Sequence, residues 1–161
     1  GGIGALRGPL HGGANEAAME LIEKFSNPEE AEKGILRMLE KKEKIMGFGH
    51  RVYKHSDPRS DVIKGWAAKL AEKDPKGHKL MAVAEQIDAV MKREKKLFTN
   101  LDFYSAVSYH LCGIPTPLFT PIFVMSRITG WTAHIIEQGQ SNALIRPLSQ
   151  YSGVPQRTVV A

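Results

Sequence analysis

The sequence has little cysteine and no long uninterrupted apolar run, and each shortage excludes a class of protein. Cys112 is the one cysteine among 161 residues, which excludes an internal disulfide framework and a structural zinc site built from paired cysteines. A single thiol also fits a reducing compartment. The longest apolar stretch, residues 118–136, contains Arg127 and is broken by Pro121, so it predicts a buried helix and not a membrane span.

The composition is that of a folded protein with a basic surface. Hydrophobic residues make up 42% and charged residues 24% of the chain, which excludes extended disorder. The formal net charge is +5, from 22 lysines and arginines against 17 acidic residues. Such a surface could attract nucleic acid, an anionic membrane or a polyphosphate. We favour a small anionic ligand, together with acidic partner segments that lie outside this sequence.

Helical periodicity dominates the chain, and no alternating strand pattern is present. Asn27-Pro28 and Asp57-Pro58 are typical helix starts, with a capping side chain before a proline. The residues from Asp74 to Gly77 predict a turn, and Gly113 fits a helix C-terminus. We therefore expect an all-α fold. The helix after Asp57 is expected to bury Val62, Ile63, Trp66, Ala67 and Leu70.

Two glycine-rich loops carry polar side chains. Residues 8–16 have the sequence GPLHGGANE, in which the glycines after His11 would let a ligand approach the imidazole and free backbone N–H groups. Residues 47–54 have the sequence GFGHRVYK, which could hold a nucleotide-like group while Arg51 or Lys54 meets phosphate. The alternatives are an incidental glycine turn and a solvated basic loop.

Three further charged residues lie in apolar surroundings. Asp102, in NLDFY, is either a helix N-cap or a partly desolvated general base, since an apolar environment raises the pKa of a carboxyl group. Arg127 lies on the apolar stretch and needs an anionic partner, which is either an internal carboxylate or a substrate carboxylate. Arg146, in LIRP, is a candidate for the same role.

Taken together and in this order, these segments resemble the citrate synthase family, with a further match at residues 118–123, LFTPIF. The resemblance extends from residue 4 to residue 147. It implies a mostly helical, two-domain homodimer that condenses an acyl-CoA with oxaloacetate and then hydrolyses the thioester. No permanently bound cofactor and no metal are implied, because the coenzyme A thioester is a substrate. Neither nucleic acid nor a membrane is expected as a partner.

The resemblance also implies a role for each matching residue. His11 corresponds to the histidine that hydrogen-bonds the thioester carbonyl as the enol forms, and Asp102 to the base that removes the α-proton. His50 corresponds to the histidine that polarises the ketone of oxaloacetate. The residues matching carboxylate-binding arginines are Arg59, Arg127 and Arg146, the last from the other subunit. Contacts to the adenine and phosphates of coenzyme A are implied for Ile45, Met46, Gly47, Phe48, Gly49 and Lys54.

The family's domain organisation predicts how this chain is divided. Residues 12–110 correspond to the small domain, and residues 1–11 and 111–161 to segments of the large domain. Family members are much longer than this chain, and a further oxaloacetate-binding histidine lies upstream of residue 1. We therefore expect a C-terminal part of the enzyme that is inactive by itself.

Three segments, at residues 16–22, 62–66 and 130–134, are similar to bacterial 2-methylcitrate synthases of this family. They lead us to expect propionyl-CoA, oxaloacetate and water as substrates, with 2-methylcitrate and coenzyme A as products. Acetyl-CoA is the alternative acyl donor, which would make the product citrate. The expected location is the cytoplasm of a bacterium, or the mitochondrial matrix if the source is eukaryotic.

Other classes of protein predict different properties. His11, His50 and Asp102 could form a facial triad for iron if they converged. A basic helical module without catalysis would bind nucleic acid with a steep dependence on salt, although no recognised DNA-binding motif is present. A degenerate, non-catalytic relative is disfavoured because all three of these residues are intact.

Overall fold

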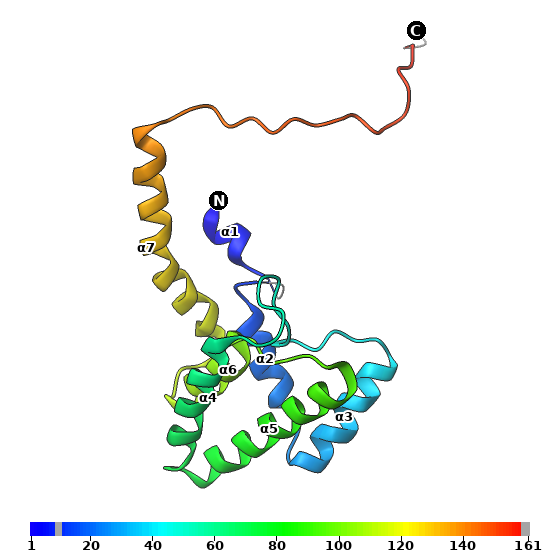
Figure 1. Ribbon diagram of the computed structural model, residues 1–161, viewed down its shortest axis with the longest axis vertical. Helices are drawn as coiled ribbons and strands as arrows, with labels where there is room; N and C mark the ends of the chain where they lie inside the picture. The colour runs from blue at the N-terminus through cyan, green and yellow to red at the C-terminus, as the bar shows by residue number, and fades with distance from the viewer. Residues whose placement is uncertain (9–10, 159–161) are drawn as a thin grey trace. The chain divides into compact units, whose positions relative to one another are not determined.

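The computed structural model describes residues 1–8 and 11–158, and within them it contains helices and no strand beyond one isolated bridge. This confirms the all-α class. The order of the elements along the chain is shown in Figure 1. They are α1 (Gly2–Leu6), α2 (Ala14–Ile22), α3 (Pro28–Glu40), α4 (Pro58–Ala71), α5 (Pro75–Lys95), α6 (Leu101–Leu111), the short 3₁₀ helix η1 (Thr116–Leu118) and α7 (Phe119–Gln140).

A capping side chain followed by proline begins α3, α4 and α5. Asn27, Asp57 and Asp74 each accept a hydrogen bond from a backbone N–H of the first turn, and proline at the first helical position loses no helical bond. The predicted starts of α3 and α4 are therefore confirmed. The turn predicted from Asp74 to Gly77 is wrong, because Asp74 and the proline after it form a third start signal of the same kind.

Helix α6 packs against α4, α2 and α5, while α3 packs against α5. The core that these helices share contains Phe103 and Tyr104 of α6 and Ile87 of α5, all fully buried. Gly113 has φ +76° and ends α6 where the sequence predicts a C-terminal glycine. The residues at the start of α6 thus lie on a helix that α2, α4, α5 and η1 all contact.

The predicted core face of α4 is partly wrong. Ala67 is fully buried and Ile63 packs against the core, as predicted. Val62 is 65% exposed and Trp66 is 56% exposed, because α4 turns its smaller side chains towards α6. The Trp66 ring lies instead under the ammonium group of Lys69, 4.7 Å from the ring centre.

The chain divides into two compact units, Gly1–Ile128 and Thr129–Ala161. The predicted helix at residues 118–136 is present as α7, but its predicted burial is wrong. Phe119 is its one buried residue, because few other described residues pack against the helix. Residues 141–158 contain neither helix nor strand. Across the described residues, no helix is both long and apolar enough to cross a membrane.

Candidate active site

One cleft in the first unit gathers most of the predicted site residues. It has a volume of about 670 Å³ and is bordered by the residues around the start of α2, the loop before α4, the starts of α4 and α6, and the first half of α7. Four lysine or arginine side chains line it against a single carboxylate, that of Asp102, so the cleft favours an anionic ligand. Its lining residues are His11, Ala14, Lys44, Ile45, Met46, Gly47, Phe48, His50, Arg51, Arg59, Asn100, Leu101, Asp102, Phe123 and Arg127.

The glycine loop at residues 47–49 is bonded to residues 98–100, directly before α6. Phe48 forms an isolated antiparallel bridge with Thr99. The Asn100 N–H donates to the Gly47 carbonyl at 2.9 Å, and the Asn100 side-chain amide donates to the Gly49 carbonyl at 3.0 Å. These bonds hold the loop that leads to His50 beside the helix that carries Asp102.

Replacing Gly47 with alanine is expected to lower the free energy of unfolding by about 2–4 kcal/mol. Gly47 has φ +88°, and an added Cβ would lie 2.7 Å from Cδ2 of the buried Phe103. The matched control is Gly65→Ala inside α4, where an added Cβ meets nothing within 4 Å and where alanine should stabilise the helix by about 0.5–1 kcal/mol. Urea unfolding of both variants checks this. A Gly47→Ala chain as stable as the original would contradict it.

The ring of His50 is oriented by the backbone that follows it. Its Nδ1 accepts hydrogen bonds from the N–H groups of Val52, at 3.1 Å, and Tyr53, at 3.2 Å. A nitrogen that accepts in this way carries no proton, so the proton of the neutral ring is assigned to Nε2. The Nε2–H group is then a donor for an acceptor oxygen in the cleft.

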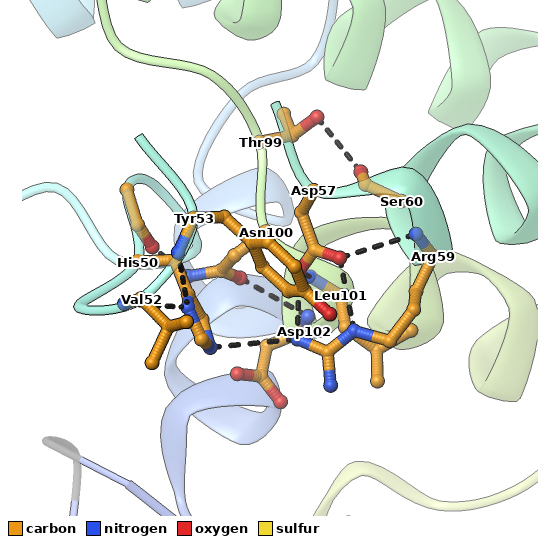
Figure 2. A network of polar contacts seen from close by, with 11 residues as sticks. His50, Val52, Tyr53, Asp57, Arg59, Ser60, Thr99, Asn100, Leu101 and Asp102 are labelled. Atoms are coloured by element: carbon orange, nitrogen blue, oxygen red, sulfur yellow. Dashed lines mark hydrogen bonds and ion pairs between the residues drawn. The ribbon is translucent and has the colours of Figure 1, made fainter. Parts of the chain in front are cut away.

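Arg59 lies between a buried carboxylate and His50, as Figure 2 shows. Asp57 accepts hydrogen bonds from Arg59 Nε at 2.9 Å and from Arg59 Nη2 at 2.8 Å. The guanidinium group holds the pKa of the Asp57 carboxyl below its ordinary value, and Asp57 in turn raises the pKa of Arg59. Arg59 Nη2 is also 3.5 Å from His50 Nε2. Both nitrogens carry hydrogen, so a ligand with an acceptor oxygen could bind both.

Asp102 is the acid that lines the cleft. Burial raises the pKa of its carboxyl group, and the charges of His11 and Arg59 partly oppose this effect. Its backbone N–H donates to the side chain of Asn100 at 3.0 Å, so Asn100 is the N-cap of α6 and Asp102 is not. No hydrogen bond to the Asp102 carboxylate is found within the described residues, and a desolvated carboxylate of this kind is a stronger base.

Helix α7 contributes an aromatic ring between two of the predicted residues. The ring of Phe123 contacts the His11 ring edge-on, with the ring centres 5.8 Å apart. On the same helix, Arg127 Cζ lies 4.9 Å from the centre of the Phe123 ring. No ion pair of Arg127 is found in the part of the chain that the structure describes. Its charge is therefore available to an anionic ligand.

Three predicted site residues do not line the cleft. The carbonyl of Gly49 is bonded to Asn100, and the ammonium group of Lys54 donates to the Arg51 carbonyl at 2.8 Å. Arg146 lies in the exposed segment after α7, in the second unit. Arg51 and Lys44, which are basic neighbours in sequence, do line the cleft.

Sequence reasoning missed the contacts of three residues that organise this cleft, Asn100, Asp57 and Phe123. Asn100 lies in the NLDFY segment with Asp102, but the sequence does not predict its cap or its bond to the glycine loop. Asp57 was identified as a helix cap alone, although it also holds Arg59. For Asp57 the sequence contains a signal, because the side chain of an arginine two residues after an aspartate cap can donate hydrogen bonds back to that aspartate. Phe123 is the last residue of the matching segment 118–123, but that match did not indicate that its ring contacts His11 and Arg127.

The iron-site alternative needs His11, His50 and Asp102 to form one ligand group. Within the described residues, no group of three or more histidine, cysteine, aspartate or glutamate side chains stands where it could hold a metal ion. The three residues nevertheless line one cleft.

The sequence of residues 1–148 matches the family described as "Citrate synthase, C-terminal domain". With the helical fold and the cleft that contains His11, His50 and Asp102, this match shows that the chain belongs to the citrate synthase family. The resemblance inferred from the motifs is confirmed.

Individual relatives agree with the family assignment. The chain is 55% identical to a 2-methylcitrate synthase of Shewanella oneidensis over 160 residues, which is 99% of this chain and 42% of the relative. It is 50% identical to citrate synthase 2 of Bacillus subtilis over 98% of this chain and 42% of that one. Among solved structures, a citrate synthase of Thermoplasma acidophilum, in a ternary complex with carboxymethyl coenzyme A and oxaloacetate, is 39% identical with a TM-score of 0.90. That match covers 98% of this chain and 43% of the other. The chain thus spans well under half the length of these relatives.

Proposed function

We propose that this chain is part of a 2-methylcitrate synthase, which condenses propionyl-CoA with oxaloacetate and water to give 2-methylcitrate and coenzyme A. The observation that carries the proposal is the cleft that places His11, His50 and Asp102 together with Arg59 and Arg127. The choice of propionyl-CoA is supported by the 55% identity to the S. oneidensis enzyme. The ternary complex of the T. acidophilum relative supports a coenzyme A thioester and oxaloacetate as the ligands.

The proposed first step is enolisation of the thioester. Asp102 takes the α-proton, which its desolvated carboxylate favours, while His11 hydrogen-bonds the carbonyl oxygen on which negative charge develops. A thioester α-proton is only weakly acidic, so the two groups must act at opposite ends of the forming enol.

In the second step, the enol carbon attacks the ketone carbon of oxaloacetate. The Nε2–H of His50 donates a hydrogen bond to the ketone oxygen. The guanidinium groups of Arg59 and Arg127 bind the two carboxylates in a defined orientation. Water then hydrolyses the thioester bond, and the sulfur leaves as the thiol of coenzyme A. The remaining cations of the cleft, Lys44 and Arg51, are proposed to meet the phosphates of coenzyme A beside residues 45–48, with Lys54 nearby on the same loop.

The proposal includes an arrangement of the complete enzyme. We assign residues 12–110 to a small domain and residues 1–11 and 111–161 to a large domain that the rest of the enzyme completes. Arg146 would then serve the site of a second subunit in a homodimer. The complete enzyme is proposed to work in the cytoplasm.

Citrate synthesis from acetyl-CoA is the second candidate, since the B. subtilis relative named citrate synthase 2 is 50% identical. The two donors differ by one methylene group. A pocket discriminates such a difference by only about 1–3 kcal/mol, so both thioesters are expected to react at different rates.

The test uses a joined enzyme, in which this chain is fused to the part of the S. oneidensis relative that it does not cover. Release of free thiol is measured with propionyl-CoA or acetyl-CoA in the presence of oxaloacetate, and the chain alone is measured beside it. We expect a kcat/KM about 10-fold or more higher for propionyl-CoA and no turnover by the chain alone. A preference for acetyl-CoA would favour citrate synthesis. A folded joined enzyme that turns over neither donor would contradict both candidates.

A further inference from the structure

Asp57 is a buried carboxylate that lies behind the cleft and does not line it. Its side chain is 0% exposed, and four hydrogen bonds saturate its two oxygens. Oδ1 accepts from the backbone N–H and from Nε of Arg59, at 3.1 and 2.9 Å, and Oδ2 accepts from Arg59 Nη2 at 2.8 Å. The fourth bond comes from the backbone N–H of Leu101 at 3.1 Å. A buried carboxylate with this set of donors remains ionised at neutral pH.

The fourth bond joins two parts of the site that are distant in sequence. Leu101 is 44 positions from Asp57, and it directly precedes Asp102. The hydroxyl groups of Ser60 and Thr99, 2.9 Å apart and buried, make a second link between the same two segments. Figure 2 shows both links, with Asp57 between the side chain of Arg59 and the start of α6. The Asp57 carboxylate therefore contacts both the guanidinium group of Arg59 and the backbone directly before Asp102.

Capping α4 does not by itself require this arrangement. Asp74 precedes a proline in the same way and begins α5, yet it is exposed, and the one bond that its carboxylate accepts from the described residues comes from the Lys76 N–H, at 3.0 Å. Asn27 caps α3 as an uncharged residue. The burial of Asp57 and its bonds to the Arg59 side chain and to Leu101 exceed what a helix cap needs.

From this geometry we infer that Asp57 is a positioning residue, which sets the guanidinium group of Arg59 and the start of α6 at a fixed separation. The inference rests on the proposed function, in which Arg59 binds a carboxylate of oxaloacetate and Asp102 removes the α-proton. Asp57 does not touch either substrate. It orients the guanidinium group of Arg59 before the substrate binds. The conformational entropy of this side chain is then already lost in the free enzyme and does not oppose binding of the substrate carboxylate.

The decisive variant is Asp57→Asn in the joined enzyme. Asparagine keeps a side-chain oxygen for the cap of α4. Its NH₂ group, however, is a donor and would face another donor, either the guanidinium group of Arg59 or the N–H of Leu101. We expect the KM for oxaloacetate to rise about 10- to 100-fold and kcat to fall, because a displacement of about 1 Å in a positioning group has effects of this size. The KM for the acyl-CoA is expected to change less than about threefold. Calorimetric titration with oxaloacetate should show the same loss of affinity.

Asp74→Asn is the matched control, since it alters the same kind of helix cap at a residue that does not line the cleft, and its kinetics should equal those of the parent. A double-mutant cycle with Arg59→Lys separates positioning from general damage. Lysine lacks the planar fork, so in that background Asp57→Asn should raise the oxaloacetate KM by less than about threefold. Melting temperatures of all variants establish that each is folded.

The outcomes separate this inference from the proposed function. A parent enzyme without turnover would contradict the proposed function. An active parent whose Asp57→Asn variant has the kinetics of Asp74→Asn would overturn the role of Asp57. Equal losses of oxaloacetate and acyl-CoA affinity, or an undiminished effect in the Arg59→Lys background, would also overturn it, because a merely structural role predicts both.

Discussion

Replacing Asp102 with asparagine in the joined enzyme is expected to lower kcat by about 10³-fold, within the range measured for loss of a general base. Asparagine has nearly the same shape and keeps the backbone bond to Asn100, so the site's geometry is preserved while its only lining carboxylate is removed. The KM for oxaloacetate is expected to change little, because in the proposed mechanism arginines bind its carboxylates. Thiol release under saturating substrates measures the effect.

The matched control is Asp61→Asn, which removes an exposed carboxylate from the first turn of α4 and should leave kcat unchanged. Stability offers a second control. Burial raises the pKa of the Asp102 carboxyl group, so the folded protein binds a proton at this group more tightly than the unfolded chain does. Ionisation of Asp102 therefore lowers the free energy of unfolding as pH rises through that pKa. Asp102→Asn should therefore not lower the melting temperature at pH 7. A kcat within about tenfold of the parent would contradict the role of Asp102 as the base.

The dependence of the parent's rate on pH follows from the same shift. In the proposed mechanism the base must be ionised to accept the α-proton, so kcat is expected to fall as pH decreases through the raised pKa of Asp102. The midpoint of this acidic limb is expected above the ordinary aspartate value of 3.8. A rate that stays constant below that value would indicate that another group accepts the proton.

Replacing Arg127 with alanine is expected to raise the KM for oxaloacetate about 30-fold or more, since a charged pair with a substrate carboxylate contributes several kcal/mol in a partly desolvated cleft. The guanidinium group lies over the Phe123 ring and has no ion pair among the described residues, so its removal leaves no buried carboxylate unpaired. Arg127→Lys should give an intermediate KM, because lysine keeps the charge and loses the fork.

The control for Arg127 is Arg37→Ala on α3, whose side chain donates to a carbonyl of its own helix. Its kinetic constants should match those of the parent. Steady-state kinetics with each substrate varied in turn provide the measurement. If Arg127→Ala raised the KM for the acyl-CoA and left that for oxaloacetate unchanged, Arg127 would be a coenzyme A contact instead.

Local sequence signals predicted most of the helices because their causes are local. The asparagine and aspartate caps before Pro28 and Pro58, and the glycine at position 113, act within one turn of the chain. The same signal at Asp74 and Pro75 was misread as a turn, since a helix start and a turn share these residues. Which face of a helix is buried depends on its neighbours, and this is why the expected burial of Trp66 was wrong.

The candidate site was predicted from motifs and a family resemblance, and the structure added the contacts that relate the motifs. His11, His50 and Asp102 are separated by some 40 to 50 residues, and no periodicity in the sequence places them in one cleft. The proton assigned to Nε2 of His50 depends on two backbone N–H groups, and the raised pKa of Asp102 depends on burial.

The sequence by itself determined the helical class, the main helix starts and the residue types available for chemistry, because propensity, capping and periodicity operate over a few neighbouring residues. Only the tertiary structure decided that Asp57 bonds to Arg59 and to Leu101 at once, that Asn100 holds the glycine loop against α6, and that four cations line one cleft with a partly desolvated carboxylate. These properties arise from contacts between segments far apart in the chain, where burial changes both pKa and hydrogen bonding.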